Sequence, residues 1–415
     1  MVRNVVIAGG GHAGFQAAFT LRQNGYAGNL LIVDEETTSP YQRPPLSKAY
    51  MKGEITEDAL AFKPEKYYVE RNIERVLGRA AAINRNESHL LLESGRKLDY
   101  DHLILATGAR NRTLDVPGND LNGIFGLRTI ADAKAVAARL PRTQSALVIG
   151  AGFIGLEFAV VAKAANIDVE VVELTSRIMS RAVSAPLSSL FNTALEREGI
   201  NFHLGQKVTR ILGRNGIATG VETDSGKRLD ADLIVYGIGV IPNTEIASQA
   251  GLSCKDGVIV DRFMSTSDPD ISAIGDCASF PNPSGDGHLR LESVQNATDQ
   301  ARCIAAKLLD KPVPYTATPW FWTEQGSLRL QIAGISAGYD QTVLLGDTDT
   351  HQYSILCFRQ GKLAAVESTN RPLDHMIARR ILSSTIAPSY EDACADGFTL
   401  KQWESSIKAA TANHQ

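Results

Sequence analysis

The apolar residues at the start of the chain form short runs that end at glycine-rich turns. The first run, Val5–Ala8, ends in Gly9-x-Gly11-x-x-Gly14 and passes directly into a segment with helical spacing of its apolar residues. A second run, Leu30–Val33, follows and ends about 20 residues after the last glycine in the acidic residues 34–36. This order of strand, glycine turn, helix, strand and acid predicts a dinucleotide-binding unit. Its helix N-terminus faces a pyrophosphate and its acid faces a ribose.

The same pattern occurs a second time. An apolar run at residues 146–149 precedes Gly150-x-Gly152-x-x-Gly155, and a further run at residues 169–172 precedes Glu173. Residues 93–108 also align without a gap on residues 224–239. Two copies of the unit predict two bound dinucleotides, and a protein that holds two dinucleotides is expected to pass electrons between them.

The last hundred residues have a different pattern. Strand-like runs at residues 328–335, 342–345, 353–358 and 363–366 precede a helical stretch at residues 375–382. This segment is therefore expected to be an α+β piece with an antiparallel sheet, unlike the repeated units.

Composition narrows the class of protein. A chain of 415 residues suggests two or three domains, and a net charge of −4 argues against general nucleic-acid binding. No apolar run reaches the roughly 18 residues that a membrane span needs, and the first strand-like run starts almost at once, so neither a membrane span nor a signal peptide is expected. The five cysteines are scattered, which predicts reduced thiols in a cytoplasmic protein and no metal site.

Taken together, the motifs resemble those of the FAD-dependent, NADH-utilising ferredoxin reductases of bacterial oxygenase systems. This family includes putidaredoxin reductase, the reductase components of aromatic-ring dioxygenases and rubredoxin reductase. The resemblance covers essentially the whole chain. Besides the two glycine motifs, it is carried by residues 43–48, 105–108, 273–278, 290–297 and 319–322.

The resemblance implies an α/β fold like that of glutathione reductase. Such a fold has two Rossmann-like dinucleotide-binding domains and a C-terminal α+β interface domain. The FAD-binding domain is expected at residues 1–109 and 242–318. The NADH-binding domain is expected at residues 110–241 and the C-terminal domain at residues 319–415.

The resemblance also implies which residues contact FAD. They are Gly9, Gly11, His12, Ala13, Gly14, Glu35, Lys48, Ala80, Thr107, Gly108, Arg128, Gly275, Asp276, Val294 and Trp322. Asp34 competes with Glu35 for the ribose, because it is the acid at the strand end. Other readings stay open: Asp276 as a helix cap, Lys48 as a surface charge in a rigid proline-rich loop, Arg128 as half of an interface ion pair, and His12 as a solvated residue at a helix start.

For NADH, the corresponding residues are Gly150, Gly152, Phe153, Ile154, Gly155, Glu173 and Gly239. A carboxylate at Glu173 would accept hydrogen bonds from the ribose hydroxyls and repel a 2′-phosphate. Arg177 lies a few residues further on, so NADPH is disfavoured rather than excluded. The resemblance places Glu157 near the nicotinamide, where it is expected to pair with Lys48; a helix-dipole carboxylate is the alternative.

The implied activity follows from a missing thiol. The disulfide-reductase branch of this fold carries a cysteine pair near residues 40–50, and this chain has none there. NADH is therefore expected to reduce FAD, which delivers two single electrons to a [2Fe–2S] ferredoxin that feeds a Rieske dioxygenase or a cytochrome P450. Lys48, Glu157 and Trp322 are the expected catalytic residues. The ferredoxin is expected to dock near Trp322 and Arg302, although Arg302 is equally well explained as a solvated charge.

Three other functions remain open: a rubredoxin reductase, an NADH oxidase, and a flavoprotein of the apoptosis-inducing type that binds a partner without turnover. The protein is expected to be a monomer or a weak homodimer that binds neither nucleic acid nor membrane.

Overall fold

The computed structural model describes residues 2–283, 285, 287–384 and 386–412. Contacts within the chain divide it into two compact units. The first comprises the residues up to Arg43, Thr56–Arg110 and Val240–Ala317, and the second comprises Pro44–Ile55, Asn111–Gly239 and the residues from Thr318 onward. The chain passes between them at strands β8 (Ala109–Asn111) and β17 (Val240–Pro242).

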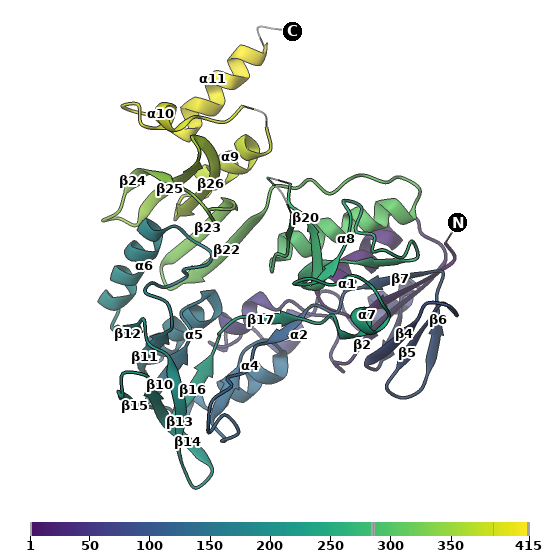
Figure 1. The fold of residues 1–415 in the computed structure, drawn as a ribbon, viewed down its shortest axis with the longest axis horizontal. Coiled ribbons are helices and arrows are strands. Elements are labelled where there is room, and N and C mark those ends of the chain that lie inside the picture. Colours follow the sequence, from purple (N-terminus) through teal and green to yellow (C-terminus); the bar gives the residue numbers. More distant parts are fainter. Residues whose placement is uncertain (1, 284, 286, 385, 413–415) are drawn as a thin grey trace. The chain divides into compact units, whose positions relative to one another are not determined.

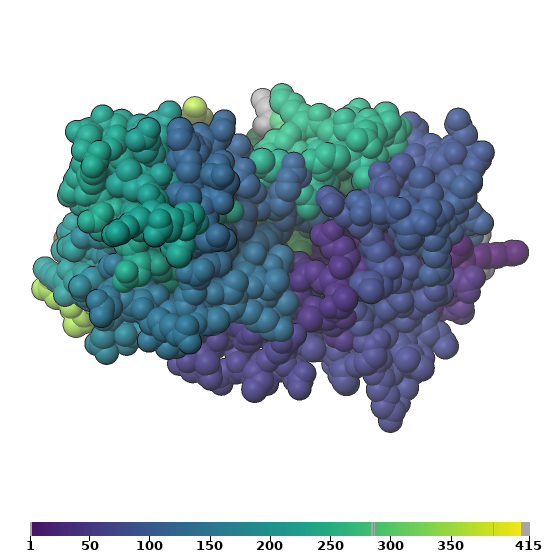
Figure 2. All heavy atoms as spheres, turned by 90° about the horizontal axis from the view of Figure 1, so that it is seen from below, coloured from purple at the N-terminus to yellow at the C-terminus, as the bar shows by residue number. Residues whose placement is uncertain are grey.

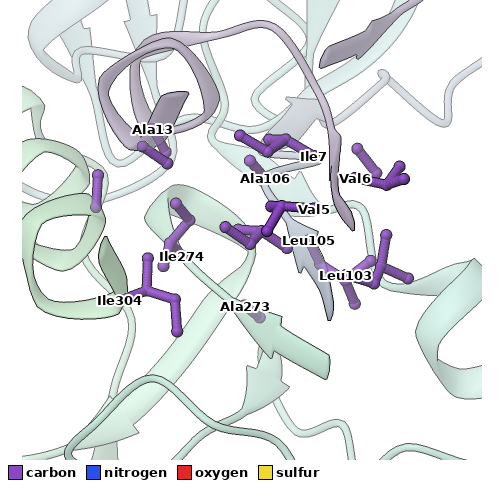
Figure 3. Close-up of a cluster of buried hydrophobic side chains, with 14 of the residues drawn as sticks. Val5, Val6, Ile7, Ala13, Leu103, Leu105, Ala106, Ala273, Ile274 and Ile304 are labelled. Carbon is purple, nitrogen blue, oxygen red and sulfur yellow. The ribbon is translucent and has the colours of Figure 1, made fainter. Parts of the chain in front are cut away.

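The first unit is built on a parallel five-stranded sheet in the order β19-β7-β1-β2-β3. Its strands are β1 (Asn4–Ala8), β2 (Asn29–Asp34), β3 (Glu74–Leu77), β7 (His102–Leu105) and β19 (Ile271–Ala273). Helices α1 (His12–Gln23) and α8 (Val294–Leu308) pack against each other on this sheet (Figure 1). Figure 3 shows their core, in which Ile7, Leu105 and Ile304 come from three distant segments. Residues 5–8 of β1 and 103–105 of β7 are apolar and buried, as expected for central strands of a parallel sheet with both faces covered.

Smaller elements complete the first unit. A three-stranded antiparallel sheet contains β4 (Ala80–Asn84), β5 (His89–Leu92) and β6 (Lys97–Asp99). Strands β18 (Val258–Ile259), β20 (Ala278–Pro281) and β21 (His288–Leu289) form another small sheet. Three short helices, α2 (Glu57–Leu60), α3 (Glu65–Glu70) and α7 (Glu245–Gln249), and the 3-10 turn η3 (Gly275–Cys277) make up the rest. In Figure 2 the green atoms of the later segment lie against the indigo atoms of the first hundred residues, so one body is built from segments far apart in sequence.

The second unit repeats the architecture of the first. Its parallel sheet has the order β12-β11-β10-β16-β9. The strands are β9 (Ile124–Gly126), β10 (Ser145–Ile149), β11 (Asp168–Glu173), β12 (Ile200–Leu204) and β16 (Leu233–Tyr236). The helices are α4 (Ile130–Ala137), α5 (Phe153–Ala164) and α6 (Ala185–Arg197), with 3-10 turns at η1 (Pro44–Ser47) and η2 (Leu140–Arg142). A second antiparallel sheet contains β13 (Val208–Arg214), β14 (Ile217–Thr223) and β15 (Arg228–Asp230).

The C-terminal segment belongs to the second unit but has its own core. Its antiparallel sheet has the order β22-β23-β26-β25-β24. The strands are β22 (Trp320–Gln325), β23 (Leu328–Gly334), β24 (Gln341–Asp347), β25 (Gln352–Arg359) and β26 (Lys362–Thr369). Helix α9 (Pro372–Leu382) packs on β23 and β26, and α10 (Tyr390–Ala393) and α11 (Leu400–Ala412) follow. A separate cluster of buried apolar residues, including Phe358 and Ile377, fills this part.

The predicted α/β fold class, with two Rossmann-like units and a C-terminal α+β segment, is confirmed. Strands β3 and β22 lie outside the strand-like runs that the sequence pattern marked. Residues 74–77 form strand β3, and Val76 is buried where this strand pairs with β2 at the edge of the parallel sheet. Residues 320–322 lie on strand β22, the edge strand of the C-terminal sheet. Across the described residues, no helix combines the length and apolar character that crossing a bilayer requires.

Candidate functional site

The first glycine turn is too tight for side chains where the chain reverses. Gly9 has φ +116°, and a Cβ there would lie 2.2 Å from the Ala106 carbonyl oxygen. A Cβ on Gly14 would lie 1.9 Å from the Gly9 carbonyl oxygen, so helix α1 packs directly on the turn. By contrast, a Cβ on Gly11 would meet nothing within 4 Å. The backbone at the start of α1 is therefore accessible to a ligand, which is what a pyrophosphate-binding turn needs.

Both glycine-turn helices begin without a side-chain cap among the described residues. Gly11 precedes α1 and Gly152 precedes α5, and neither helix has an acidic residue in its first turn. Helices α4, α6 and α8 differ, since Thr129, Ser184 and Ser293 accept a hydrogen bond from the first turn of each. The first backbone N–H groups of α1 and α5 lack acceptors within their own helices and carry the positive end of the helix dipole. Two such helix starts fit the phosphates of two dinucleotides.

The acids that end β2 and β11 occupy equivalent positions. Gly9 and Gly150 each donate a backbone hydrogen bond of 2.8 Å to the residue that precedes the acid, Val33 and Val172 respectively. Asp34 is therefore the counterpart of Glu173. A Cβ on Gly10 would lie 2.0 Å from the Asp34 carboxylate, so this carboxylate lies against the glycine turn.

Asp34 and Glu35 have different environments. Burial raises the pKa of Asp34 to about 6. The Glu35 side chain is 64% exposed and lies 3.5 Å from the Arg79 guanidinium. The geometry thus gives Asp34 the position against the turn, and it leaves Glu35 at the surface.

A third segment of the first unit meets the glycine turn at η3. Gly275 has φ +75°, and a Cβ there would lie 2.8 Å from the Cβ of Ala13. The Gly275 N–H donates to the Gln300 side chain at 2.7 Å, which fixes the backbone immediately before Asp276. Sequence reasoning missed Gln300, because only the fold brings α8 to this turn.

The end of β7 is held in a similar way. The Asn243 side chain donates to the Thr107 carbonyl at 2.8 Å, and the Thr107 hydroxyl donates to the Asn243 carbonyl at 2.7 Å. The Asn243 N–H also donates to the Gly108 carbonyl at 2.9 Å. The sequence carries no local signal for this contact, so the role of Asn243 in fixing Thr107 and Gly108 was not predicted.

The remaining predicted FAD residues lie on several elements. The His12 ring packs edge-on against Phe62, with ring centres 4.6 Å apart. Ala80 is the first residue of β4, and Val294 is the first residue of α8. Arg128 belongs to the second unit, where its backbone N–H donates to Asp132 at 3.0 Å.

The second unit brings Lys48 and Glu157 together. The Lys48 Nζ lies 2.6 Å from Glu157 Oε2; the Glu157 side chain is 2% exposed and that of Lys48 is 18% exposed. Ser47 donates to the same carboxylate oxygen at 2.5 Å, and Thr323 donates to the other oxygen at 2.6 Å. A buried carboxylate needs such partners, because its charge has lost its water. The predicted ion pair is present, together with two hydroxyl donors that the sequence did not reveal.

Aromatic residues lie on the same two elements, α5 and β22, that supply Glu157 and Thr323. Phe153, at the start of α5, packs on Phe321 with ring centres 4.5 Å apart. Trp322 lies 5.6 Å from Trp320, centre to centre, and the Arg379 guanidinium lies 4.5 Å from the centre of the Trp320 ring. All three aromatic residues of this strand pack against neighbours, and all three are only half-buried.

The acid of the second unit is held by the backbone around it. Glu173 Oε2 accepts from the Ala151 N–H at 2.7 Å, and Oε1 accepts from Thr175 N–H at 2.8 Å. The Arg177 guanidinium donates to the carbonyls of Ser180 and Val183 at 2.7 and 3.0 Å. Arg177 therefore stabilises its own loop, and its guanidinium is already engaged there.

The turns of this unit resemble those of the first. A Cβ on Gly150 would lie 2.6 Å from the Gly237 carbonyl oxygen, and one on Gly155 would lie 2.2 Å from the Gly150 carbonyl oxygen. Gly239 has φ +99°, and its missing Cβ would lie 3.1 Å from the Arg181 guanidinium. Arg181 was not predicted, although it follows the strand-end acid closely in sequence.

No thiol accompanies Lys48 in the segment Pro44–Ile55. All five cysteines are free; of these, Cys277 follows Asp276 directly. The Cys277 Sγ lies 3.3 Å from the Ile274 carbonyl, and burial raises the pKa of this thiol. A buried thiol with a raised pKa stays protonated and is a poor redox nucleophile.

Comparison with known proteins identifies the family. The family model described as pyridine nucleotide-disulphide oxidoreductase matches residues 3–301, and a reductase C-terminal model matches residues 320–403. The chain belongs to the pyridine nucleotide-disulphide oxidoreductase family. Within it, the chain is 45% identical to rhodocoxin reductase of Rhodococcus erythropolis over 399 residues, 96% of this chain and 93% of the relative.

Solved structures agree with this assignment. The ferredoxin reductase of the CYP199A2 system from Rhodopseudomonas palustris shares 47% identity with a TM-score of 0.94, over 97% of this chain and 99% of that chain. The reductase in a covalent putidaredoxin reductase–putidaredoxin complex shares 36% identity with a TM-score of 0.95, over 98% and 99% of the two chains. The resemblance to ferredoxin reductases is therefore confirmed. Members of this family bind FAD and NAD(H), and the two glycine turns with their acids fit these cofactors.

Proposed function

We propose that the protein is an NADH-dependent flavoprotein reductase that supplies electrons singly to a [2Fe–2S] ferredoxin of a bacterial oxygenase system. The observation that carries this function is the segment around Lys48, which contacts the buried carboxylate of Glu157 and contains no cysteine, whereas disulfide reductases are expected to carry a cysteine pair near residues 40–50. Bound FAD supplies the step between two-electron and one-electron chemistry. The protein's own residues bind the cofactors, fix charges and exclude thiols.

The first unit is proposed to bind FAD and the nucleotide-binding part of the second unit to bind NADH, with domain limits at residues 1–109 and 242–318, 110–241 and 319–415. The starts of α1 and α5 receive the phosphates, and Glu173 receives the ribose of NADH. For the FAD ribose we favour Asp34 over Glu35, because its carboxylate is the one that lies against the glycine turn. Ala13, Gly275 and Asp276 line the same region.

Lys48 is proposed to place a fixed positive charge beside the flavin. A charge held in a partly buried site acts more strongly than one in water and needs no reorganisation during the reaction. Glu157 holds the Lys48 ammonium in place, and Ser47 and Thr323 hold Glu157. Trp322 is proposed to lie on the side of the flavin site that faces the electron acceptor.

The acceptor is proposed to dock near Trp322 and Arg302. Arg302 is 61% exposed and pairs with Asp299 at 3.0 Å, which is an exposed i,i+3 pair of little net stability. An acidic ferredoxin can therefore compete with Asp299 for this guanidinium. The protein is proposed to act as a monomer or weak homodimer in the cytoplasm.

The acceptor is tested by steady-state turnover with NADH. A [2Fe–2S] ferredoxin and a rubredoxin are offered separately under argon, and dissolved oxygen is offered in air-saturated buffer without either protein. The proposal expects fast reduction of the ferredoxin and slow reaction with oxygen. Faster reduction of the rubredoxin would indicate a rubredoxin reductase of the same family. Fast turnover with oxygen would indicate an NADH oxidase, and no turnover with any acceptor would indicate a flavoprotein that only binds a partner.

A further inference from the structure

Strand β22 presents two different faces. Side chains alternate along a strand, so Phe321 and Thr323 point to one face and Trp320 and Trp322 to the other. On the first face, Phe321 packs on Phe153 and Thr323 bonds to Glu157, both residues of α5. The second face carries the tryptophan pair. A single strand thus joins the helix of the nucleotide-binding turn to the aromatic pair.

Thr323 is placed to control Glu157. Its side chain is 0% exposed, and its hydroxyl donates to Glu157 Oε1 at 2.6 Å. A hydroxyl has one proton, and here that proton is committed to the carboxylate. Oε2 of Glu157 remains directed toward Lys48 and Ser47. The carboxylate is therefore held from both sides by two segments, residues 47–48 and strand β22, that lie far from α5 in sequence.

We propose that Thr323 is a positioning residue. Its hydrogen bond to Glu157 sets how closely the carboxylate holds the Lys48 ammonium, and it couples this ion pair to the strand that carries Trp322. The inference rests on the proposed function, since it concerns the charge beside the flavin. Without the hydroxyl, Oε1 of Glu157 loses its donor and the carboxylate becomes a stronger acceptor for Lys48. The ammonium is then drawn closer to Glu157, and its field at the cofactor weakens.

Thr323→Val tests this directly, because valine has the shape of threonine and no hydroxyl. Thr323→Ser keeps the hydroxyl. The matched control is Thr223→Val, which removes the hydroxyl of another buried threonine in the same unit, bonded to Ser225 at 2.9 Å. All variants are prepared as FAD-loaded full-length protein.

Two readouts are needed. The midpoint potential of the bound flavin is measured by chemical reduction, and its reduction rate is measured with NADH in anaerobic stopped flow. We expect Thr323→Val to slow reduction by about tenfold, the scale of one lost hydrogen bond to a charged group. Its potential should fall by about 30 mV, the two-electron equivalent of tenfold. Thr323→Ser and Thr223→Val should remain within about threefold of the unmodified protein in rate, well below the tenfold of one lost bond.

The proposal is overturned if Thr323→Val leaves the potential unchanged, or if Thr223→Val shifts it equally. A Thr323→Ser variant that behaves like valine would also overturn it. Because the potential is measured without NADH or ferredoxin, it tests the role of Thr323 even where the proposed electron donor or acceptor is wrong. Failure of the unmodified protein to react with NADH would count against the proposed function alone.

Discussion

Replacing Lys48 with methionine should destabilise the second unit more than replacing its partner Glu157 with glutamine. Methionine matches the length of lysine but carries no charge, so the substitution leaves the Glu157 carboxylate buried with two hydroxyl donors and no cation. Glutamine has the shape of glutamate, and the lysine that it leaves behind is 18% exposed and can turn to water. The asymmetry follows from the different burial of the two partners.

The expected magnitudes follow from the same contacts. Removing one partner of a buried ion pair lowers the free energy of unfolding by about 3–5 kcal/mol. Because Lys48 is partly exposed, the loss for Lys48→Met should lie at the lower end of this range, about 3 kcal/mol. Glu157→Gln leaves hydrogen-bonding groups in place and should cost about 1–2 kcal/mol. The double variant should cost less than the sum, with a coupling energy of about 2 kcal/mol.

Tryptophan fluorescence during urea unfolding measures this cycle. The chain's three tryptophans, Trp320, Trp322 and Trp403, all belong to the second unit, so their signal reports the unit that holds the pair. FAD is kept at one saturating concentration, because a bound ligand shifts the apparent stability.

A coupling energy below about 0.5 kcal/mol would refute the reasoning, because substitutions at independent sites are additive to within that amount. The same conclusion would follow if Glu157→Gln were the more harmful substitution. Either result would mean that the two side chains do not depend on each other in solution.

Three further predictions concern the cofactors and the acceptor. Burial raises the pKa of Asp34 to about 6, above its usual 3.8, so this carboxyl contributes stability at low pH that is lost as the pH rises through 6. Asp34→Asn should therefore raise the melting temperature of the FAD-free protein more at pH 8 than at pH 5. It should also weaken FAD binding, as measured by fluorescence titration. Glu35→Gln should have neither effect. Glu173→Gln should lower kcat/KM for NADH by about 10- to 100-fold, the scale of about 1.5–3 kcal/mol for lost hydrogen bonds to a charged group, and should reduce the preference for NADH over NADPH. Arg177→Ala should lower the melting temperature but change that preference by less than about threefold, because its guanidinium bonds within its own loop. A large gain in selectivity for NADH on losing Arg177 would contradict the structure. Arg302→Glu should raise KM for an acidic ferredoxin several-fold at low salt and much less at high salt, with the rate of flavin reduction by NADH unchanged; an effect that salt does not screen would argue against docking at this residue.

The fold and the glycine turns could be predicted because their signals are local. A turn such as Gly9–Gly14 is specified by a few adjacent residues, and its tight contacts require glycine wherever the strand and helix meet. The repeat added independent support, since two copies of one pattern predicted two parallel sheets. Strand β3 was missed because its apolar residues are too few to show a period.

The hydrogen bonds of the site could not be predicted in the same way. Ser47 lies 110 positions from Glu157, and Thr323 lies 166 positions from it. A serine or threonine hydroxyl carries no pattern that indicates a distant partner. Their neighbours did give a signal, since Ser47 precedes Lys48 and Thr323 follows Trp322. Gln300 and Asn243 support their turns across similar tertiary contacts and had no local signal at all.

The central claim is that electrons enter as a pair from NADH and reside on a flavin with no thiol to receive them. Anaerobic titration of the FAD-loaded protein with NADH tests this most directly. The account predicts that one equivalent of NADH per FAD bleaches the flavin absorbance completely. Retention of yellow oxidised flavin in the presence of excess NADH, or a requirement for two equivalents per FAD, would contradict it.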